Sequence, residues 1–279
     1  MDQSVAAAEA GAITADLVYS IDTGVKPVNE TMEEGNLKRV YTGEFAGHEM
    51  KISNGRPVRD RFDLDVNGFE FVDHPTRMND FFDADELTSV YYREVEALVK
   101  ERTGCNWVHV FDHTLRTGDR EEQEAKLIRE PVLRVHNDYT EWSGPQRVRD
   151  LMPDRAEELI RHRFAIVQVW RAINRPIEAN PLAIADARSL READLIPSER
   201  RYPNRVGETY QVQHNPDHRW FYFPKMTRDE AIVFKVYESE TDGRARWTAH
   251  TSFDDPTTPD GAPPRQSIEM RSIAFWAPA

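Results

Sequence analysis

Residues 163–173 read RFAIVQVWRAI, a run of β-branched and aromatic side chains that is typical of a buried β-strand. Five further segments share this texture and are separated by polar, charged or proline-containing stretches. They are NWVHVFDHTL (106–115), PVLRVHNDYT (131–140), RWFYFP (219–224), EAIVFKVYES (230–239) and SIEMRSIAFW (267–276). Short strands at irregular spacing favour a mainly β fold with flanking helices over a doubly wound parallel sheet. The fold class that we expect is a double-stranded β-helix, a cupin-like jelly roll.

Two other segments have helical periodicity. Apolar side chains recur three or four positions apart between Asp85 and Gly104, and a second pattern of this kind covers residues 145–163. Both are predicted to be helices that flank the strand-rich body. Residues 1–35 show neither period, so we expect a loosely ordered N-terminal arm or a wrap around the core, followed by a single domain over residues 36–279.

The composition is that of a folded protein. With 279 residues and 39% hydrophobic side chains the chain can bury a sizeable core, and no apolar run approaches the ~20 residues of a bilayer crossing. Cys105 is the only cysteine, which excludes an internal disulfide and cysteine-rich zinc or iron–sulfur sites. The N-terminal residues include acids and no basic start, so we expect no secretory signal and a cytoplasmic location.

The net charge of −13 restricts the partners. Such a surface repels nucleic acid and anionic lipid, so we predict neither a nucleic-acid nor a membrane partner. An anionic substrate needs a local cluster of arginines to overcome this repulsion. The sequence leaves the oligomeric state open, with a homodimer as one candidate.

Several common catalytic signatures are absent from the sequence. Neither G-x-G-x-x-G nor G-x-x-x-x-G-K-[ST] occurs, which argues against nicotinamide dehydrogenases, P-loop enzymes and Rossmann methyltransferases. The G-x-S-x-G elbow of serine hydrolases is missing as well. Histidines and acids are therefore the remaining candidates for chemistry.

The segment HNDYT places His136 and Asp138 two positions apart. In a strand this spacing points both side chains to the same face, so that they can bind one metal ion. The apolar PVLRV that precedes them is typical of a buried strand. A strand histidine that is hydrogen-bonded to its neighbouring acid is the alternative interpretation.

A second same-face pair follows further along the chain. His250 lies in RWTAHTSF after a predicted strand, and Arg265 and Ser267 follow at i and i+2. Two histidines and one carboxylate on one side of iron leave three positions open, which is what a bidentate 2-oxo acid and O₂ require. An arginine can bind the far carboxylate of 2-oxoglutarate in a charge-assisted pair, with a serine hydroxyl adding a hydrogen bond.

Other histidines compete for the distal ligand position. His214 and His218 flank the short sequence NPD before RWFYFP, and either is an alternative to His250. We favour His250 because it lies between a predicted buried strand and the Arg265–Ser267 pair. His109 and His113 are interpreted as ordinary strand histidines.

The order of these motifs resembles that of the Fe(II)/2-oxoglutarate-dependent oxygenases, in which H-x-D, a distal histidine and R-x-S lie near the C-terminal end of a double-stranded β-helix. More narrowly, five segments look like the small-molecule branch that includes gibberellin-desaturase-like and cephamycin-methoxylation-type oxidoreductases. They are HNDYT (136–140), QVWRAIN (168–174), HRWFYFP (218–224), AHTSFDDP (249–256) and RQSIEMRSIAFW (265–276). The resemblance covers roughly residues 55–278.

This resemblance implies specific roles. The iron ligands are expected to be His136, Asp138 and His250. Arg265, with help from Ser267, is expected to bind the carboxylate of 2-oxoglutarate, and Arg271 in the same predicted strand is the alternative arginine. The implied reaction is hydroxylation or desaturation of a small molecule, as in specialised metabolism, with O₂ as co-substrate and succinate and CO₂ as coproducts.

Strand parity adds candidates for the substrate pocket. Arg134 shares the face of His136 and Asp138, and a buried arginine needs an anionic partner on the protein or the substrate. Gln168 and Trp170 share one face of their strand and are expected to line the pocket. Three residues are expected near its rim: Tyr139, Trp142 and His214.

Two other functions are kept open. A cupin-type metalloenzyme, such as an isomerase or a dioxygenase that does not use 2-oxoglutarate, needs the three metal ligands but has no use for Arg265 and Ser267. A binding protein without catalysis on the same barrel has no reason to collect three iron-type ligands.

Overall fold

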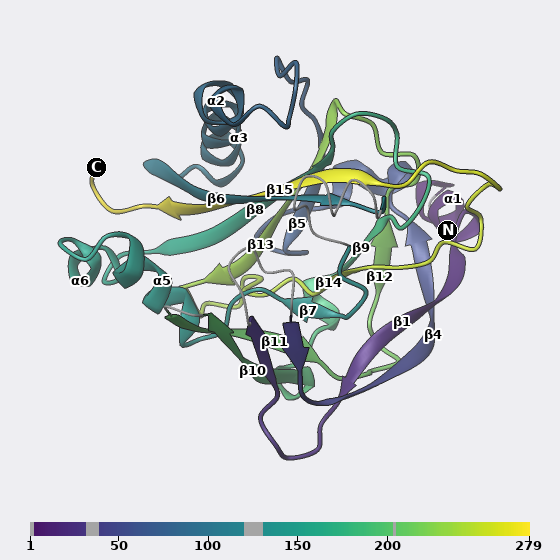
Figure 1. Ribbon diagram of the computed structural model, residues 1–279, viewed down its shortest axis with the longest axis horizontal. Coiled ribbons are helices and arrows are strands. Elements are labelled where there is room, and N and C mark those ends of the chain that lie inside the picture. Colours follow the sequence, from purple (N-terminus) through teal and green to yellow (C-terminus); the bar gives the residue numbers. More distant parts are fainter. Residues whose placement is uncertain (1–2, 32–38, 120–130, 203–204) are drawn as a thin grey trace.

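The computed structural model describes residues 3–31, 39–119, 131–202 and 205–279, and the structural statements below concern this part of the chain. Two β-sheets face each other (Figure 1). The larger sheet has ten strands in the spatial order β1 (Ile13–Ile21), β4 (Glu44–Asn54), β12 (Trp220–Tyr222), β9 (Leu182–Ala185), β14 (His250–Ser252), β7 (His136–Asn137), β11 (Arg205–Val212), β10 (Leu195–Tyr202), β2 (Val28–Thr31) and β3 (Arg39–Tyr41). The smaller has five, in the order β5 (Phe69–Asp73), β13 (Glu230–Glu238), β8 (Phe164–Ala172), β15 (Gln266–Phe275) and β6 (Trp107–Thr117).

Short helices lie around these sheets. They are α1 (Gln3–Ala10), α2 (Ala84–Glu86), α3 (Tyr92–Thr103), α5 (Ser143–Leu151) and α6 (Ala156–Leu159), with a π-turn (Leu87–Tyr91) between α2 and α3 and 3₁₀ turns at Arg56–Arg61, Ala187–Ser189 and Glu192–Asp194. Figure 1 shows α2 and α3 on the outer side of the five-stranded sheet, away from the larger sheet. None of the helices described is long and apolar enough to cross a membrane.

The predicted strand over residues 163–173 is β8, near the middle of the five-stranded sheet. All nine of its residues are buried, because its two faces meet different apolar layers. Ile166 and Trp170 point between the sheets, whereas Val167 and Val169 pack against the helices on the other side. The predicted mainly β, jelly-roll fold with flanking helices is confirmed.

The first predicted helix is close to what the structure has. Helical turns run from Ala84 to Thr103 and end where Gly104 adopts a left-handed conformation at φ 66°. The second prediction, one helix over residues 145–163, is wrong in detail. The chain forms α5 and α6 with a break at Met152, because Pro153 has no N–H to continue the helical hydrogen bonds.

The N-terminal residues are more regular than expected. Residues Ile13–Ile21 form β1, which pairs antiparallel with β4 along its whole length. Ala15, Leu17 and Tyr19 are buried, whereas Thr14 and Asp16 are exposed and Val18 is half-buried, so a period of two is present that the prediction of a loose arm or wrap does not include. The predicted strand before His136 is, in contrast, shorter: only His136–Asn137 is strand, with one isolated bridge from Arg134 to Val18.

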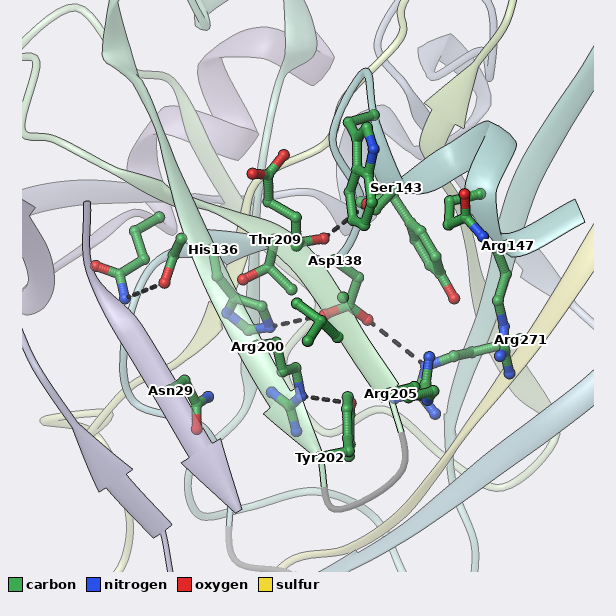
Figure 2. A pocket seen from close by; sticks show the side chains of 18 of the residues that line it. Asn29, His136, Asp138, Ser143, Arg147, Arg200, Tyr202, Arg205, Thr209 and Arg271 are labelled. Carbon is green, nitrogen blue, oxygen red and sulfur yellow. Dashed lines mark hydrogen bonds and ion pairs between the residues drawn. The ribbon is translucent and has the colours of Figure 1, made fainter. Parts of the chain in front are cut away.

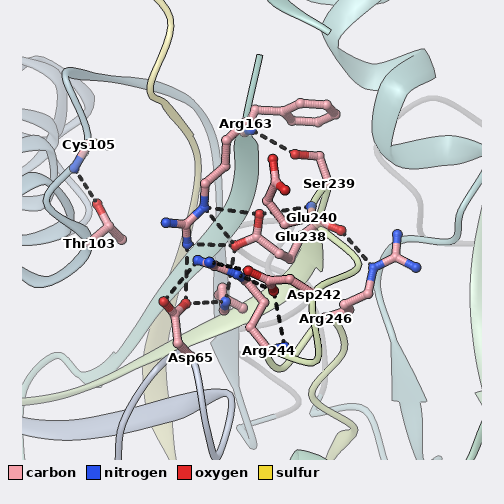
Figure 3. A network of polar contacts seen from close by, with 12 residues as sticks. Asp65, Thr103, Cys105, Arg163, Glu238, Ser239, Glu240, Asp242, Arg244 and Arg246 are labelled. Carbon is pink, nitrogen blue, oxygen red and sulfur yellow. Dashed lines mark hydrogen bonds and ion pairs between the residues drawn. The ribbon is translucent and has the colours of Figure 1, made fainter. Parts of the chain in front are cut away.

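A network of charges is buried where β13 ends (Figure 3). The carboxylate of Glu238, fully buried, accepts hydrogen bonds from Arg163 at 2.8 Å and from Lys235 at 3.1 Å. Lys235, itself 1% exposed, also donates to Asp65 at 2.7 Å, and Arg244 contacts Asp65 at 3.1 Å. These contacts join β13 and β8 to the loop that holds Asp65.

Candidate metal and cofactor site

The three side chains predicted to share a metal site lie together. In the larger sheet His250 on β14 pairs directly with His136 on β7, so that their ring centroids are 4.4 Å apart. Asp138 follows β7, and its Oδ1 lies 3.6 Å from Nε2 of His136. One ligand-type atom from each residue lies within 4.8 Å of the other two, which is the separation that one metal ion can bridge.

In both imidazoles Nδ1 contacts a backbone carbonyl, and Nε2 is left for the candidate metal site. Nδ1 of His136 lies 2.8 Å from the carbonyl oxygen of Arg134, and Nδ1 of His250 lies 3.1 Å from that of Thr248. A carbonyl only accepts, so each Nδ1 carries the proton and each Nε2 keeps a lone pair. Nε2 of His250 is buried without any partner in the described structure. Proteins usually orient a histidine ligand through such a hydrogen bond from the ring nitrogen that does not bind the metal.

The protonation states suit a metal. Burial, with a smaller contribution from the neighbouring His250, lowers the pKa of His136 to about 3, so its imidazole is neutral at neutral pH. Burial alone raises the pKa of Asp138, but the positive charge of Arg271 opposes it most strongly and the hydrogen bond from Gln168 adds to this effect, so the pKa falls well below the usual range. Neutral imidazoles and an ionised carboxylate are the forms that bind a metal.

Asp138 is held from two sides. Nε2 of Gln168 on β8 donates to Oδ2 of Asp138 at 2.6 Å, and Nε of Arg271 on β15 lies 3.6 Å from the same oxygen. Arg271 also bonds Thr114 at 2.9 Å and contacts Asp112 and Glu269. Arg271 is thus occupied by carboxylates of the protein itself, and it orients a candidate metal ligand.

Arg265, unlike Arg271, forms no ion pair with a carboxylate of the described residues. It is 2% exposed, donates to the carbonyl of Asn180 at 2.6 Å and contacts the hydroxyl of Ser252, which lies two residues after His250 on β14. Its guanidinium lies 5.4 Å from the ring centre of Trp170. Burial, together with the nearby positive charge of Arg116, lowers the pKa of Arg265 to about 9. Since no carboxylate in the described part of the chain pairs with it, this buried cation calls for an anion from a ligand.

Unpaired polar atoms collect around this site. Nε of Arg265, Oγ of Ser267, Nε2 of His250 and Oε1 of Gln168 are all buried without a hydrogen-bond partner in the described residues. Arg265 contacts Ser252 on the strand of His250, Ser267 lies two residues after Arg265, and Gln168 bonds Asp138. Buried polar groups in folded proteins are nearly always paired, so these orphans indicate a ligand. A divalent cation accepts the lone pair of Nε2 of His250, and a dicarboxylate accepts hydrogen bonds from Arg265 and Ser267. The residues present therefore fit Fe(II) and 2-oxoglutarate.

A cavity of about 250 Å³ opens next to His136 and Asp138 (Figure 2). Of the predicted pocket residues, Arg134, Tyr139 and Trp142 line it. The guanidinium of Arg134 lies over the ring of Tyr41 at 3.6 Å, so an aromatic face takes the place of the predicted anionic partner.

The other predicted pocket residues lie elsewhere. Gln168 is fully buried and holds Asp138, and Trp170 packs in the core between the sheets next to Arg265. Neither lines the cavity, and His214 does not line it either. The ring of His214 stacks on His48 at 3.8 Å, which makes its predicted place at the rim wrong.

Sequence reasoning missed Asn137. Its fully buried amide donates to the carbonyls of Tyr139 and Val236, and its oxygen accepts from the backbone N–H of Thr248 at 3.1 Å. Asn137 thereby ties the two segments that carry His136 and His250 to each other and to β13. The only signal was its position between two ligand-type residues, on the opposite face of the strand.

Comparisons with known proteins agree with this geometry. Residues 17–275 match the family described as "Oxidoreductase/YMDC permease-like domain". The chain is 33% identical over 255 residues to the hydroxylase/desaturase CTB9 of Cercospora beticola, covering 84% of this chain and 78% of that protein. It is 32% identical over 235 residues to the Fe(II)/2-oxoglutarate-dependent dioxygenase nvfI of Aspergillus novofumigatus, covering 82% of this chain and 83% of that protein.

A solved structure of the iron and alpha-ketoglutarate-dependent endoperoxidase NvfI is similar as well. It superimposes with a TM-score of 0.85 at 26% identity, over 96% of this chain and 100% of the other. The similarity therefore extends over the whole double-sheet fold, and it favours 2-oxoglutarate over the cupin-type alternative. The chain belongs to this oxidoreductase family and is an Fe(II)/2-oxoglutarate-dependent dioxygenase.

Proposed function

We propose that His136, Asp138 and His250 bind one Fe(II), and that Arg265 with Ser267 binds the distal carboxylate of 2-oxoglutarate. The orphaned, buried donors of Arg265 and Ser267 beside the histidine pair are the observation that supports this assignment most directly. Arg271 is the weaker candidate for the carboxylate because Asp112 and Glu269 already neutralise it.

The reaction is proposed to be hydroxylation or desaturation of a small specialised metabolite, since CTB9 is named a hydroxylase/desaturase. Iron with 2-oxoglutarate and O₂ supplies the oxidising chemistry and yields succinate and CO₂. The chain orients the ligands through Gln168, Arg271 and the two backbone carbonyls, and the cavity beside Asp138 holds the substrate. The cytoplasmic location, the homodimer and the lack of a nucleic-acid or membrane partner stay predictions. Light scattering after gel filtration tests the homodimer.

An anaerobic absorption spectrum tests the cofactor assignment. Addition of 2-oxoglutarate to the Fe(II)-loaded protein is expected to produce a weak visible charge-transfer band. In Arg265→Gln the band is expected to need about 10- to 100-fold more 2-oxoglutarate, since a charge-assisted pair contributes about 1.5–3 kcal/mol. Bound iron is expected to be unchanged in this variant. A wild-type protein that binds iron but shows no band contradicts the 2-oxoglutarate assignment.

Gln168 gives a separate test of how Asp138 is held. Gln168→Leu keeps a buried side chain of similar size but removes the 2.6 Å hydrogen bond to the carboxylate. We expect Fe(II) affinity to fall by about 10- to 100-fold, as for other residues that orient metal ligands. Titration with Fe(II) under anaerobic conditions measures this, and Gln168→Glu with its added charge provides the comparison. Unchanged iron affinity in Gln168→Leu means that Arg271 alone orients Asp138.

A further inference from the structure

The cavity next to the metal site is positively charged although the chain as a whole is strongly negative. Six arginines and four carboxylates of the described residues line it, a surplus of two positive charges, against a net charge of −13 for the chain. The arginines are Arg116, Arg134, Arg147, Arg200, Arg205 and Arg271. A local surplus of this sign attracts an anion that the rest of the surface repels.

The carboxylates of the cavity are already engaged by the protein. Asp112 and Asp138 contact Arg271, as described above. Glu208 pairs with Lys26 and accepts from Thr140 at 2.5 Å. Asp150 accepts from Gln146 at 2.8 Å. None of these acids contacts Arg147, Arg200 or Arg205 in the part of the chain that the structure describes.

Arg147 on α5 is the arginine most clearly left without an anion. Its guanidinium lies over the ring of Phe111 at 4.7 Å, and its Nε is buried with no acceptor in the described structure. Figure 2 shows its side chain reaching toward the side of the cavity where Arg271 lies. The Nε edge of a guanidinium presents two parallel N–H groups, which match the two oxygens of a carboxylate.

A second group of positive charge lines the cavity from β10 and β11. Arg205 lies over the ring of Tyr202 at 4.2 Å, and Nε of Arg200 donates to the Tyr202 hydroxyl at 2.5 Å. Burial raises the pKa of Tyr202, but Arg200 and Arg205 outweigh it and the pKa is lowered. The positive potential therefore extends across the cavity from α5 to β10 and β11.

We propose that the substrate of this dioxygenase carries a carboxylate, and that Arg147 binds it through its unpartnered Nε edge while Arg200 and Arg205 add to the positive potential. The inference rests on the proposed function, because it takes this cavity as the substrate site. It separates two anion sites: Arg265 is buried and does not line the cavity, so 2-oxoglutarate and the substrate carboxylate use different arginines.

Paired probes test this proposal by equilibrium dialysis against the Fe(II)- and 2-oxoglutarate-loaded protein without O₂. The probes are naphthoic, cinnamic and phenylbutyric acids, each beside its own primary amide. In the wild type the acids are expected to bind about 10- to 100-fold more tightly than the amides, the value of one charge-assisted pair. Arg147→Gln is expected to abolish this preference and Arg147→Lys to retain part of it.

Arg149→Gln is the matched control, because Arg149 lies two residues further on the same helix and pairs with Glu157 at the surface. It is expected to keep the full preference for acids. The proposal is overturned if acids and amides bind alike to the wild type, if the preference survives in Arg147→Gln, or if excess 2-oxoglutarate displaces the acids. Absence of the charge-transfer band is a different result, which contradicts the proposed cofactor and not the anion site, since dialysis does not depend on the band.

Discussion

Replacement of His250 by alanine is expected to abolish iron binding and turnover together. Only His136 and Asp138 then remain, and two ligands do not complete the facial set that this metal chemistry requires. We expect Fe(II) affinity to fall by more than about 100-fold, the upper end of what is lost when only an orienting residue is removed. Iron retained after desalting, measured with a ferrous chelator, and succinate released from 2-oxoglutarate check the two parts of this expectation.

A second histidine serves as the control. His214 is one of the two competing distal ligands in the sequence, the other being His218, and its ring stacks on His48 outside the group of ligand-type residues. His214→Ala is therefore expected to leave bound iron and the charge-transfer band unchanged. Because His250 is 2% exposed, its replacement also leaves a small void, and thermal unfolding of the apo variant shows whether the fold survives. Iron lost in His214→Ala but kept in His250→Ala reverses the assignment.

The parts of the fold that the sequence predicts are those with a strong local pattern. β8 and β13 are rich in β-branched and aromatic residues, and β15 ends in the apolar run IAF, so their composition identifies them. The spacing of His136 and Asp138 needed only the rule that alternate strand residues share a face. His250 was chosen for its place after a predicted strand, and the two histidines lie in direct register.

What the sequence did not predict depends on pairing between distant segments. β1 is partly polar and gains its strand conformation from β4, some thirty residues further along the chain. The sheet carries His136 on a strand of two residues, which no composition rule detects. The neutralisation of Arg271 by Asp112 and Asp138 is equally hidden, because Asp112 lies on β6 and Asp138 follows β7, both far from Arg271 in the sequence.

Loss of the Glu238 charge is expected to have the largest effect on stability. In Glu238→Gln the shape is kept, but Lys235 and Arg163 lose the carboxylate that both contact. Removal of one partner from a buried ion pair costs about 3–5 kcal/mol, and here Lys235 and Arg163 are left to share the half-exposed carboxylate of Asp65. We expect the free energy of unfolding in urea to fall by this amount. Glu240→Gln, two residues further along the chain, is the control. It is expected to change the free energy of unfolding by less than about 0.5 kcal/mol.

A double variant separates the cost of an unpaired charge from the cost of lost hydrogen bonds. In Lys235→Met with Glu238→Leu, both buried charges are replaced by apolar groups, while Arg163 keeps Asp65 at 3.2 Å. Such replacements of a whole buried pair are often neutral or stabilising, so we expect most of the stability lost in Glu238→Gln to return. If the double variant is as unstable as Glu238→Gln, the lost hydrogen bonds of the Glu238 carboxylate and not the unpaired charge are the cause. If stability is recovered, the charged network contributes little net stability. Its role is then to fix the pairing of charges at the end of β13, the strand that pairs with the Gln168 strand β8.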